Sequence, residues 1–163
     1  MTGTILGVHI AAGVLWFGCV TLTGDHVDDR DDRLVLEDAK LGEARALSEL
    51  EESLEALLVR LAPAAIALLD AGSSSQARAA TVAQRRGQLE AVLLVAACRT
   101  GTDLVRVTHP AVRKTFGVSP ARQELRRLTA DELGIAPPPN WNHRAPAFAV
   151  ALVIAREEDV KNG

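Results

Sequence analysis

The stretch ILGVHIAAGVLWFGCV, residues 5–20, decides how the chain begins to fold. It is almost wholly apolar, it contains three glycines, and His9 is its one ionisable side chain. Its length approaches the ~18 apolar residues that suggest a membrane-spanning helix. The glycines weaken a helix interior, no Lys or Arg flanks either end, and the charged run DHVDDRDDR follows closely. The stretch therefore predicts a pair of buried strands, and no membrane partner is expected.

The residues that follow this hairpin extend the prediction to three connected strands. TILGVHI (4–10) and VLWFGCVTLTG (14–24) form the paired strands, with AAG as the turn between them. The polar run DHVDDRDDR (25–33) is typical of an exposed hairpin tip, in which we expect His26 to be solvated. RLVLED (33–38) then returns as a third strand, so the first part of the sheet is expected to be antiparallel.

Beyond residue 40, apolar residues recur at spacings of three and four, which is typical of amphipathic helices. Short apolar runs between the helical segments predict buried strands. The order predicts an α/β fold with a mixed five-stranded sheet, three strands antiparallel through hairpins and two parallel, flanked by helices. We expect a single domain over 1–163 with a short polar tail over 156–163. The expected elements are a helix over 41–62, a strand over 64–70, a helix over 77–101 capped by SSSQ (73–76), a strand over 102–109, helices over 110–117 and 119–134, a linker over 135–142 and a helix over 143–160.

Charge is distributed unevenly along the chain, although the net charge is only −3. Residues 25–61 carry 12 acidic and 5 basic side chains, a local charge of −7. Residues 78–127 carry 10 basic and 3 acidic side chains, a local charge of +7. A basic half can bind a polyanion while the whole chain stays acidic. Solvated helix faces would give the same pattern, so the sequence leaves both explanations open.

The two cysteines indicate the compartment. Cys19 and Cys98 lie far apart in apolar segments, and no paired-cysteine motif is present. This favours two buried, reduced thiols in a cytoplasmic protein. No positively charged segment precedes the first apolar run, so a secretory signal is not expected.

Five local sequences resemble, in order and spacing, the RuvC Holliday junction resolvases, which have a ribonuclease H-like fold. They are ILGVHIAAG, RLAPAAIALLDAG, RGQLEAVLLVAA, VRVTHPAVRKTFG and HRAPAFAVA, and they cover most of residues 5–155. The resemblance implies a homodimer and a DNA partner, either a four-way junction or a duplex. It also implies hydrolysis of a phosphodiester with two divalent metal ions. In that mechanism, carboxylates from the first strand, the central strand and the last helix hold the metals.

At the positions where the resolvases have carboxylates that hold the metal ions, this chain has mostly other residues. The corresponding positions are, in chain order, His9, Leu69, His143 and Pro146. Asp70 directly follows Leu69, and it can act as a metal ligand only if it lies beyond the end of its strand. Mg²⁺ requires oxygen ligands, so no cofactor is expected, and Mg²⁺ or Mn²⁺ is expected only if the chain is an active nuclease.

Two further interpretations of the histidines remain open. His9, Asp70 and His143 are the candidate catalytic positions, and two imidazoles with one carboxylate suit Zn²⁺, Mn²⁺ or Fe²⁺ better than Mg²⁺. His109 belongs to the same strand-end region and is a possible further ligand. Alternatively, His9 is a core histidine whose ring nitrogens are satisfied locally, and His143 simply begins a helix.

Basic side chains of residues 78–127 are candidates for contacts with DNA phosphates. They are Arg85, Arg86, Arg113, Lys114 and Arg122. The resemblance places Arg113 and Lys114 where the resolvases have lysines that contact DNA, and guanidinium groups bind phosphates without reading bases.

Three functions therefore remain open. The first is a catalytically degenerate resolvase-like protein that binds branched or duplex DNA through 78–127 without cleaving it. The second is a protein-interaction module without DNA binding, and the third is a metal-dependent endonuclease with a His/Asp site. The scarcity of carboxylates favours the first and argues against an enzyme.

Overall fold

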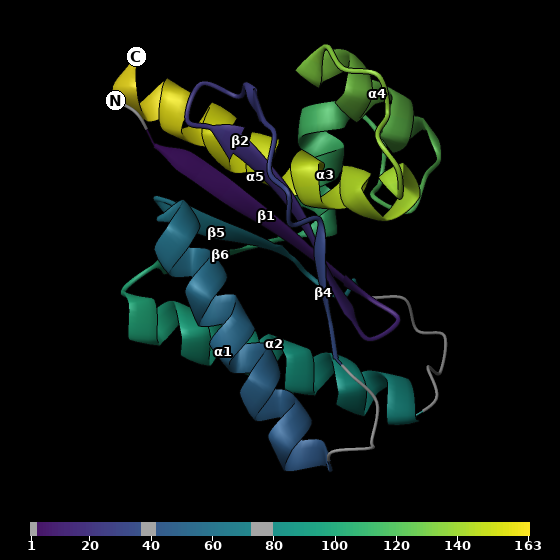
Figure 1. Ribbon diagram of the computed structural model, residues 1–163. Coiled ribbons are helices and arrows are strands. Elements are labelled where there is room, and N and C mark those ends of the chain that lie inside the picture. The colour runs from purple at the N-terminus through teal and green to yellow at the C-terminus, as the bar shows by residue number, and fades with distance from the viewer. Residues whose placement is uncertain (1–2, 37–41, 73–79) are drawn as a thin grey trace.

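The computed structural model describes residues 3–36, 42–72 and 80–163. Within them, a sheet lies between two layers of helices (Figure 1). The strand order is β3-β2-β1-β5-β6, and β4 also pairs with β2. The elements are β1 (Thr4–Ala11), β2 (Val14–Thr21), β3 (His26–Val27), β4 (Arg33–Val35), α1 (Glu43–Leu61), β5 (Ala65–Leu69), α2 (Ala80–Thr100), β6 (Asp103–Val107), α3 (His109–Phe116), α4 (Glu124–Leu133) and α5 (Trp141–Asn162).

The sheet is mixed, as the sequence predicts. β1 and β2 form an antiparallel hairpin, whereas β5 runs parallel to β1 and β6 runs parallel to β5. Ala12 and Gly13 turn the chain between β1 and β2 with positive φ angles of 52° and 75°. Because β1 and β5 are parallel neighbours, their carboxyl ends meet at one edge of the sheet, and this edge carries the site described below.

Each face of the sheet has its own hydrophobic layer. α1 and α2 cover one face, α5 lies on the other, and α3 and α4 pack against α5 on that side (Figure 1). Leu54 of α1 and Leu89 of α2 are completely buried against the first face. Phe148 of α5 is completely buried against the second. Among the described residues, none of the helices combines the length and the apolar character needed to cross a membrane.

The predicted third strand consists of two short pieces. β3 and β4 both pair antiparallel with β2, so the pairing begins inside the run that the sequence predicts as an exposed tip. The tight turn closes earlier, because the Thr21 amide donates to the Asp25 carbonyl at 2.8 Å. His26 is consequently half-buried rather than solvated, and its ring centroid lies 5.4 Å from that of Phe148.

The last helix begins earlier and ends later than the sequence predicts. Asn140 precedes it in a left-handed conformation, and Nε1 of Trp141 donates to the Arg126 carbonyl at 2.8 Å, which fixes the first turn. The predicted polar tail over 156–163 is helical as far as Asn162. The predicted SSSQ cap over 73–76 lies outside the described residues.

The two cysteines differ in environment, which corrects the prediction that both are buried. Cys19 is buried in β2, and burial raises the pKa of its thiol to about 11. Cys98 is exposed, because α2 directs Leu93, Ala96 and Ala97 toward the core and Cys98 follows them on the outer side.

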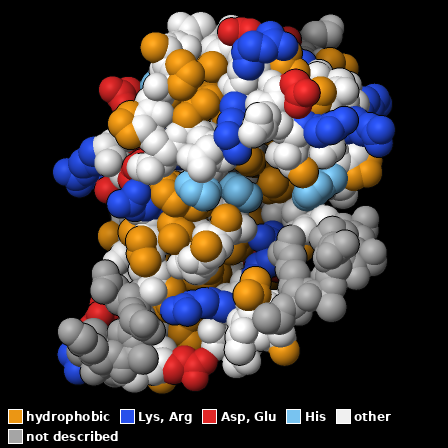
Figure 2. All heavy atoms as spheres, turned by 90° about the vertical axis from the view of Figure 1, so that its right-hand side faces the viewer, with side chains coloured by type: hydrophobic (Ala, Val, Ile, Leu, Met, Phe, Trp, Pro, Cys, Tyr) orange, Lys and Arg blue, Asp and Glu red, His pale blue; other side chains and the backbone are white. Residues whose placement is uncertain are grey.

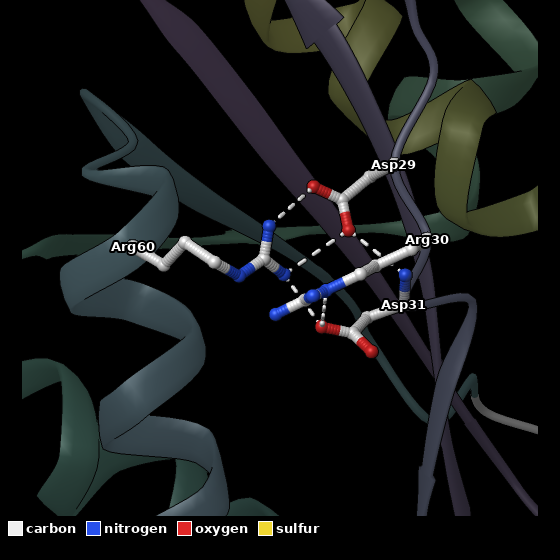
Figure 3. Close-up of polar contacts among 4 residues, drawn as sticks. All are labelled: Asp29, Arg30, Asp31 and Arg60. Carbon is white, nitrogen blue, oxygen red and sulfur yellow. Dashed lines mark hydrogen bonds and ion pairs between the residues drawn. The ribbon is translucent and has the colours of Figure 1, made fainter.

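The acidic segment after β3 is held by an arginine of α1 (Figure 3). Arg60 donates to both carboxylate oxygens of Asp29, at 2.9 and 3.1 Å, and to Asp31 at 2.5 Å. The hydrogen bonds from Arg60 hold the pKa of Asp29 below its ordinary value. The carboxylates of this segment also face Arg144, a buried arginine of α5 whose pKa burial lowers. Some of the acidic side chains of residues 25–61 therefore balance the positive charges of specific arginines.

Replacing Arg60 with glutamine is expected to lower the thermal stability at neutral pH and to leave it nearly unchanged in acid. The folded-state pKa of Asp29 is depressed, so the interaction stabilises the fold above the ordinary aspartate pKa of about 3.9 and is lost as the pH falls below it. Thermal unfolding of both proteins across this pH range measures the difference in Tm. A difference that persists below the folded-state pKa would contradict the assignment.

Candidate functional site

A cavity of about 420 Å³ opens at the carboxyl ends of β1 and β5. The ends of these strands, the start of α3, the segment before α4 and the first turns of α5 surround it. Figure 2 shows imidazole side chains in a row across the middle of this face, with Lys and Arg side chains above and below. The side chains that carry chemistry in its lining are His9, Asp70, Arg86, His109 and Asn142. In open α/β sheets, ligands bind at this edge.

His9 is fixed to α5. It lies on β1 and is half-buried, and its Nδ1 lies 3.0 Å from the backbone oxygen of His143. A carbonyl oxygen only accepts, so Nδ1 carries the hydrogen and Nε2 is the second ring nitrogen. Burial is the main cause that lowers the pKa of His9, and the positive charge of Arg86 lowers it further. The neutral ring is therefore favoured when the cavity is empty of anions.

Asp70 and His109 are joined through the backbone. β5 ends at Leu69, so Asp70 lies beyond the strand, the position in which the sequence allows it to serve as a ligand. His109 Nε2 lies 3.0 Å from the Asp70 backbone oxygen and donates to it. The Asp70 carboxylate instead lies 3.7 Å from a guanidinium nitrogen of Arg106, which also bonds to Glu90.

The His143 side chain is directed elsewhere. Its ring stacks on the indole of Trp16, with centroids 4.6 Å apart and planes 10° from parallel. Only its backbone carbonyl reaches His9. The structure therefore brings His9 and Asp70 to one cavity with His109, whereas the His143 ring lies outside the described lining.

Arg86 of α2 lies between the carboxyl ends of β1 and β5. Its two terminal nitrogens donate to the carbonyls of Ile10 and Leu69, each at 2.9 Å, and Nε lies 3.3 Å from Glu90. It thus bridges β1 and β5 where the chain leaves the sheet. Its guanidinium is a fixed positive charge in the wall of the cavity.

The donor groups of this cavity do not fit a pair of Mg²⁺ ions. Asp70 is the one carboxylate among the described residues that line it. Over residues 3–36, 42–72 and 80–163, no three or more His, Cys, Asp or Glu side chains are grouped so that they could hold a metal ion. Mg²⁺ needs oxygen ligands in octahedral geometry, and a guanidinium in the wall adds repulsion.

The four other predicted DNA-contacting side chains are exposed. Arg113 and Lys114 lie on α3, Arg122 lies in the segment before α4, and Arg85 lies on α2 beside Gly13. None of them has an ion-pair partner within the described part of the chain. Other arginines of 78–127 are paired with acids, namely Arg99, Arg106 and Arg127. The positive charge without an ion-pair partner is therefore smaller than the sequence suggests, and among the described residues of this segment it lies on these four side chains and on Arg126.

Sequence reasoning missed two features of this site. The stacking of His143 on Trp16 has no sequence signal, because it depends on how α5 crosses β2. Asn142 was expected in an extended linker, but it lies in the first turn of α5 and lines the cavity. Asn140, a residue type favoured at N-caps, is the sequence signal for an earlier helix start, although its side chain makes no capping hydrogen bond to the helix.

Solved structures of resolvases resemble this fold. Thermus thermophilus RuvC in complex with a Holliday junction substrate gives a TM-score of 0.75 at 21% sequence identity, covering 97% of this chain and 96% of that chain. A second T. thermophilus RuvC structure gives 0.73 at 20% identity, with the same coverage. The yeast mitochondrial Holliday junction resolvase Ydc2 gives 0.62 at 13% identity, covering 99% of this chain and 81% of that chain.

No protein-family model matches the sequence, and no curated protein matches it. At these identities, the likeness to the solved structures shows the fold. It confirms the predicted ribonuclease H-like arrangement, a mixed sheet with β1, β5 and β6 parallel and helices on both faces.

Proposed function

We propose that this chain is a resolvase-like protein that binds branched or duplex DNA through basic side chains and does not cleave it. The observation that carries the proposal is the scarcity of carboxylates in the cavity at the ends of β1 and β5. There, a guanidinium and two imidazoles face a single lining carboxylate among the described residues. Two-metal hydrolysis needs several converging carboxylates, and these donors do not supply them.

The positions of the exposed basic side chains Arg113, Lys114 and Arg122 support DNA as the partner. Arg113 and Lys114 follow His109 on α3, and Arg122 follows two residues that line the cavity, Pro120 and Ala121. Cations around a strand-end cavity can contact the phosphates of a DNA backbone that passes over it. T. thermophilus RuvC, the fold relative described above, is in complex with a Holliday junction substrate. A homodimer is part of the same proposal.

A four-way DNA junction is expected to bind in the presence of EDTA and to stay intact in Mg²⁺ or Mn²⁺. Binding depends on fixed cations, so removal of divalent metals should not weaken it. Electrophoretic mobility shift and denaturing gels measure the two results on the same labelled junction, with a linear duplex as comparison.

Two results would contradict this proposal in different ways. Metal-dependent cleavage that is lost in Asp70→Asn would establish the metal-dependent endonuclease instead. Absence of binding to both junction and duplex, even at low salt, would favour the protein-interaction module.

A further inference from the structure

Two imidazoles in the cavity present their second ring nitrogens as available groups. His9 donates Nδ1–H to the His143 carbonyl, and His109 donates Nε2–H to the Asp70 carbonyl, each at 3.0 Å. These bonds fix the tautomer of each neutral ring. Nε2 of His9 and Nδ1 of His109 are left as acceptors, and each becomes an N–H donor when its ring is protonated.

The charges around His9 favour an anion. Arg86 of α2 acts on it with positive charge, and the neighbouring rings of His109 on α3 and His143 on α5 also lower the pKa of His9. Asp70 is the one lining carboxylate of the described residues, and Arg106 lies 3.7 Å from it. The second carboxylate of this region, Glu90, pairs with both Arg86 and Arg106.

The cavity is also large enough for a ligand group. Its volume of about 420 Å³ lies within the range of ligand pockets, about 300–1,000 Å³. Asn142 adds an amide side chain at the first turn of α5.

We propose that this cavity binds a phosphate group directly, without a metal ion, between the imidazole rings of His9 and His109 and the guanidinium of Arg86. The phosphate belongs either to a DNA backbone, in which case the inference rests on the proposed function, or to free phosphate. The resemblance assigns metal ions to this edge of the sheet, and here protein cations neutralise the phosphate instead.

Binding is coupled to proton uptake. Burial and neighbouring cations lower the pKa of His9 in the empty cavity, and a bound anion stabilises the imidazolium and raises it again. Affinity for a DNA phosphodiester, whose charge does not change in this range, therefore rises as the pH falls through the range in which a histidine ordinarily titrates, about 6.5. The charged and titratable groups around His9 are Arg86, His109 and His143, and Asp70 lines the same cavity.

The first test uses the unmodified, ¹⁵N-labelled chain with EDTA at about pH 6, below the ordinary histidine pKa. Inorganic phosphate is added, with sodium chloride at equal ionic strength as the comparison. The imidazole ¹⁵N signals of His9 and His109 are expected to shift with phosphate alone. His26, which lies outside the cavity lining, serves as the internal reference. Equal responses to phosphate and chloride would overturn the proposal.

The second test measures junction binding in EDTA for His9→Gln and for the matched control His26→Gln. His9→Gln is expected to weaken binding about tenfold at pH 6 and to have little effect at about pH 8, because a charge-assisted hydrogen bond is lost only in acid. His26→Gln should match the wild type at both. Circular dichroism of each variant verifies that it is folded.

The outcomes separate this inference from the proposed function. If phosphate shifts the imidazole signals but His9→Gln does not change DNA binding, the cavity binds phosphate, and its ligand is free phosphate rather than a DNA backbone. If neither test responds while junction binding persists, the cavity inference is overturned and the proposed function stands. If the wild type binds no DNA, the proposed function fails, and the phosphate titration alone decides on the cavity.

Discussion

Replacing Arg113, Lys114 and Arg122 together with alanine is expected to weaken binding to a four-way DNA junction about 100-fold at about 0.1 M salt. All three side chains are exposed, and the described residues give none of them an ion-pair partner. A cation that neutralises a phosphate releases counterions and contributes about 0.9 to the slope of log affinity against log salt. The slope should therefore fall by roughly 2 to 3, which fluorescence anisotropy over a salt series measures.

The matched control removes the same charge elsewhere. Arg45, Arg99 and Lys161 are exposed cations, each of which pairs with a glutamate. Their replacement with alanine changes the net charge equally but leaves the surface beside the cavity intact, so the salt slope should change little. Equal losses in the two triple variants would show that only net charge matters, and would contradict a DNA-binding surface on α3 and the segment before α4.

The hairpin of β1 and β2 could be predicted because its signal is local. Glycines weaken a helix interior, so a long apolar run that contains several of them favours strands. A strand that is buried on both faces of a sheet is apolar at nearly every position, which matches this run. The division of the third strand into β3 and β4 could not be predicted. It depends on the Thr21–Asp25 turn and on the capture of Asp29 by Arg60, which is 31 residues distant in the chain.

The site was predictable where topology decides it and unpredictable where side-chain orientation decides it. His9 and Asp70 lie together because the carboxyl ends of parallel neighbours meet at one edge. The sequence predicts that Arg86 contacts DNA, and it gives no sign that the guanidinium also bonds to the carbonyls of Ile10 and Leu69. The direction of this side chain on α2 cannot be deduced from spacing, because an exposed arginine and one that bridges two strands have the same sequence signal.

Gly7→Ala is expected to destabilise the fold by more than about 3 kcal/mol and to lower Tm by about 10 °C or more. Gly7 and Gly18 are directly paired across β1 and β2, and α5 rests on this pair. A Cβ on Gly7 would lie 1.7 Å from the Ala147 carbonyl oxygen, and one on Gly18 would lie 2.6 Å from the Phe148 amide nitrogen. Backbone atoms of a buried helix cannot move aside as a flexible side chain can, so the helix must shift. Thermal unfolding monitored by circular dichroism measures the loss.

Gly87→Ala is the matched control, because it makes the same chemical change on α2 where no atom lies within 4 Å. Alanine in a helix interior should stabilise the protein by about 0.5–1 kcal/mol. Equal stability of Gly7→Ala and wild type would show that α5 does not rest on the glycine pair. The same contact also positions the site, because His9 lies two residues after Gly7 on the same face of β1 and bonds to the His143 carbonyl of α5. Any Gly7→Ala protein that still folds should therefore lose the fixed Nδ1–H tautomer of His9, which its imidazole ¹⁵N signals report.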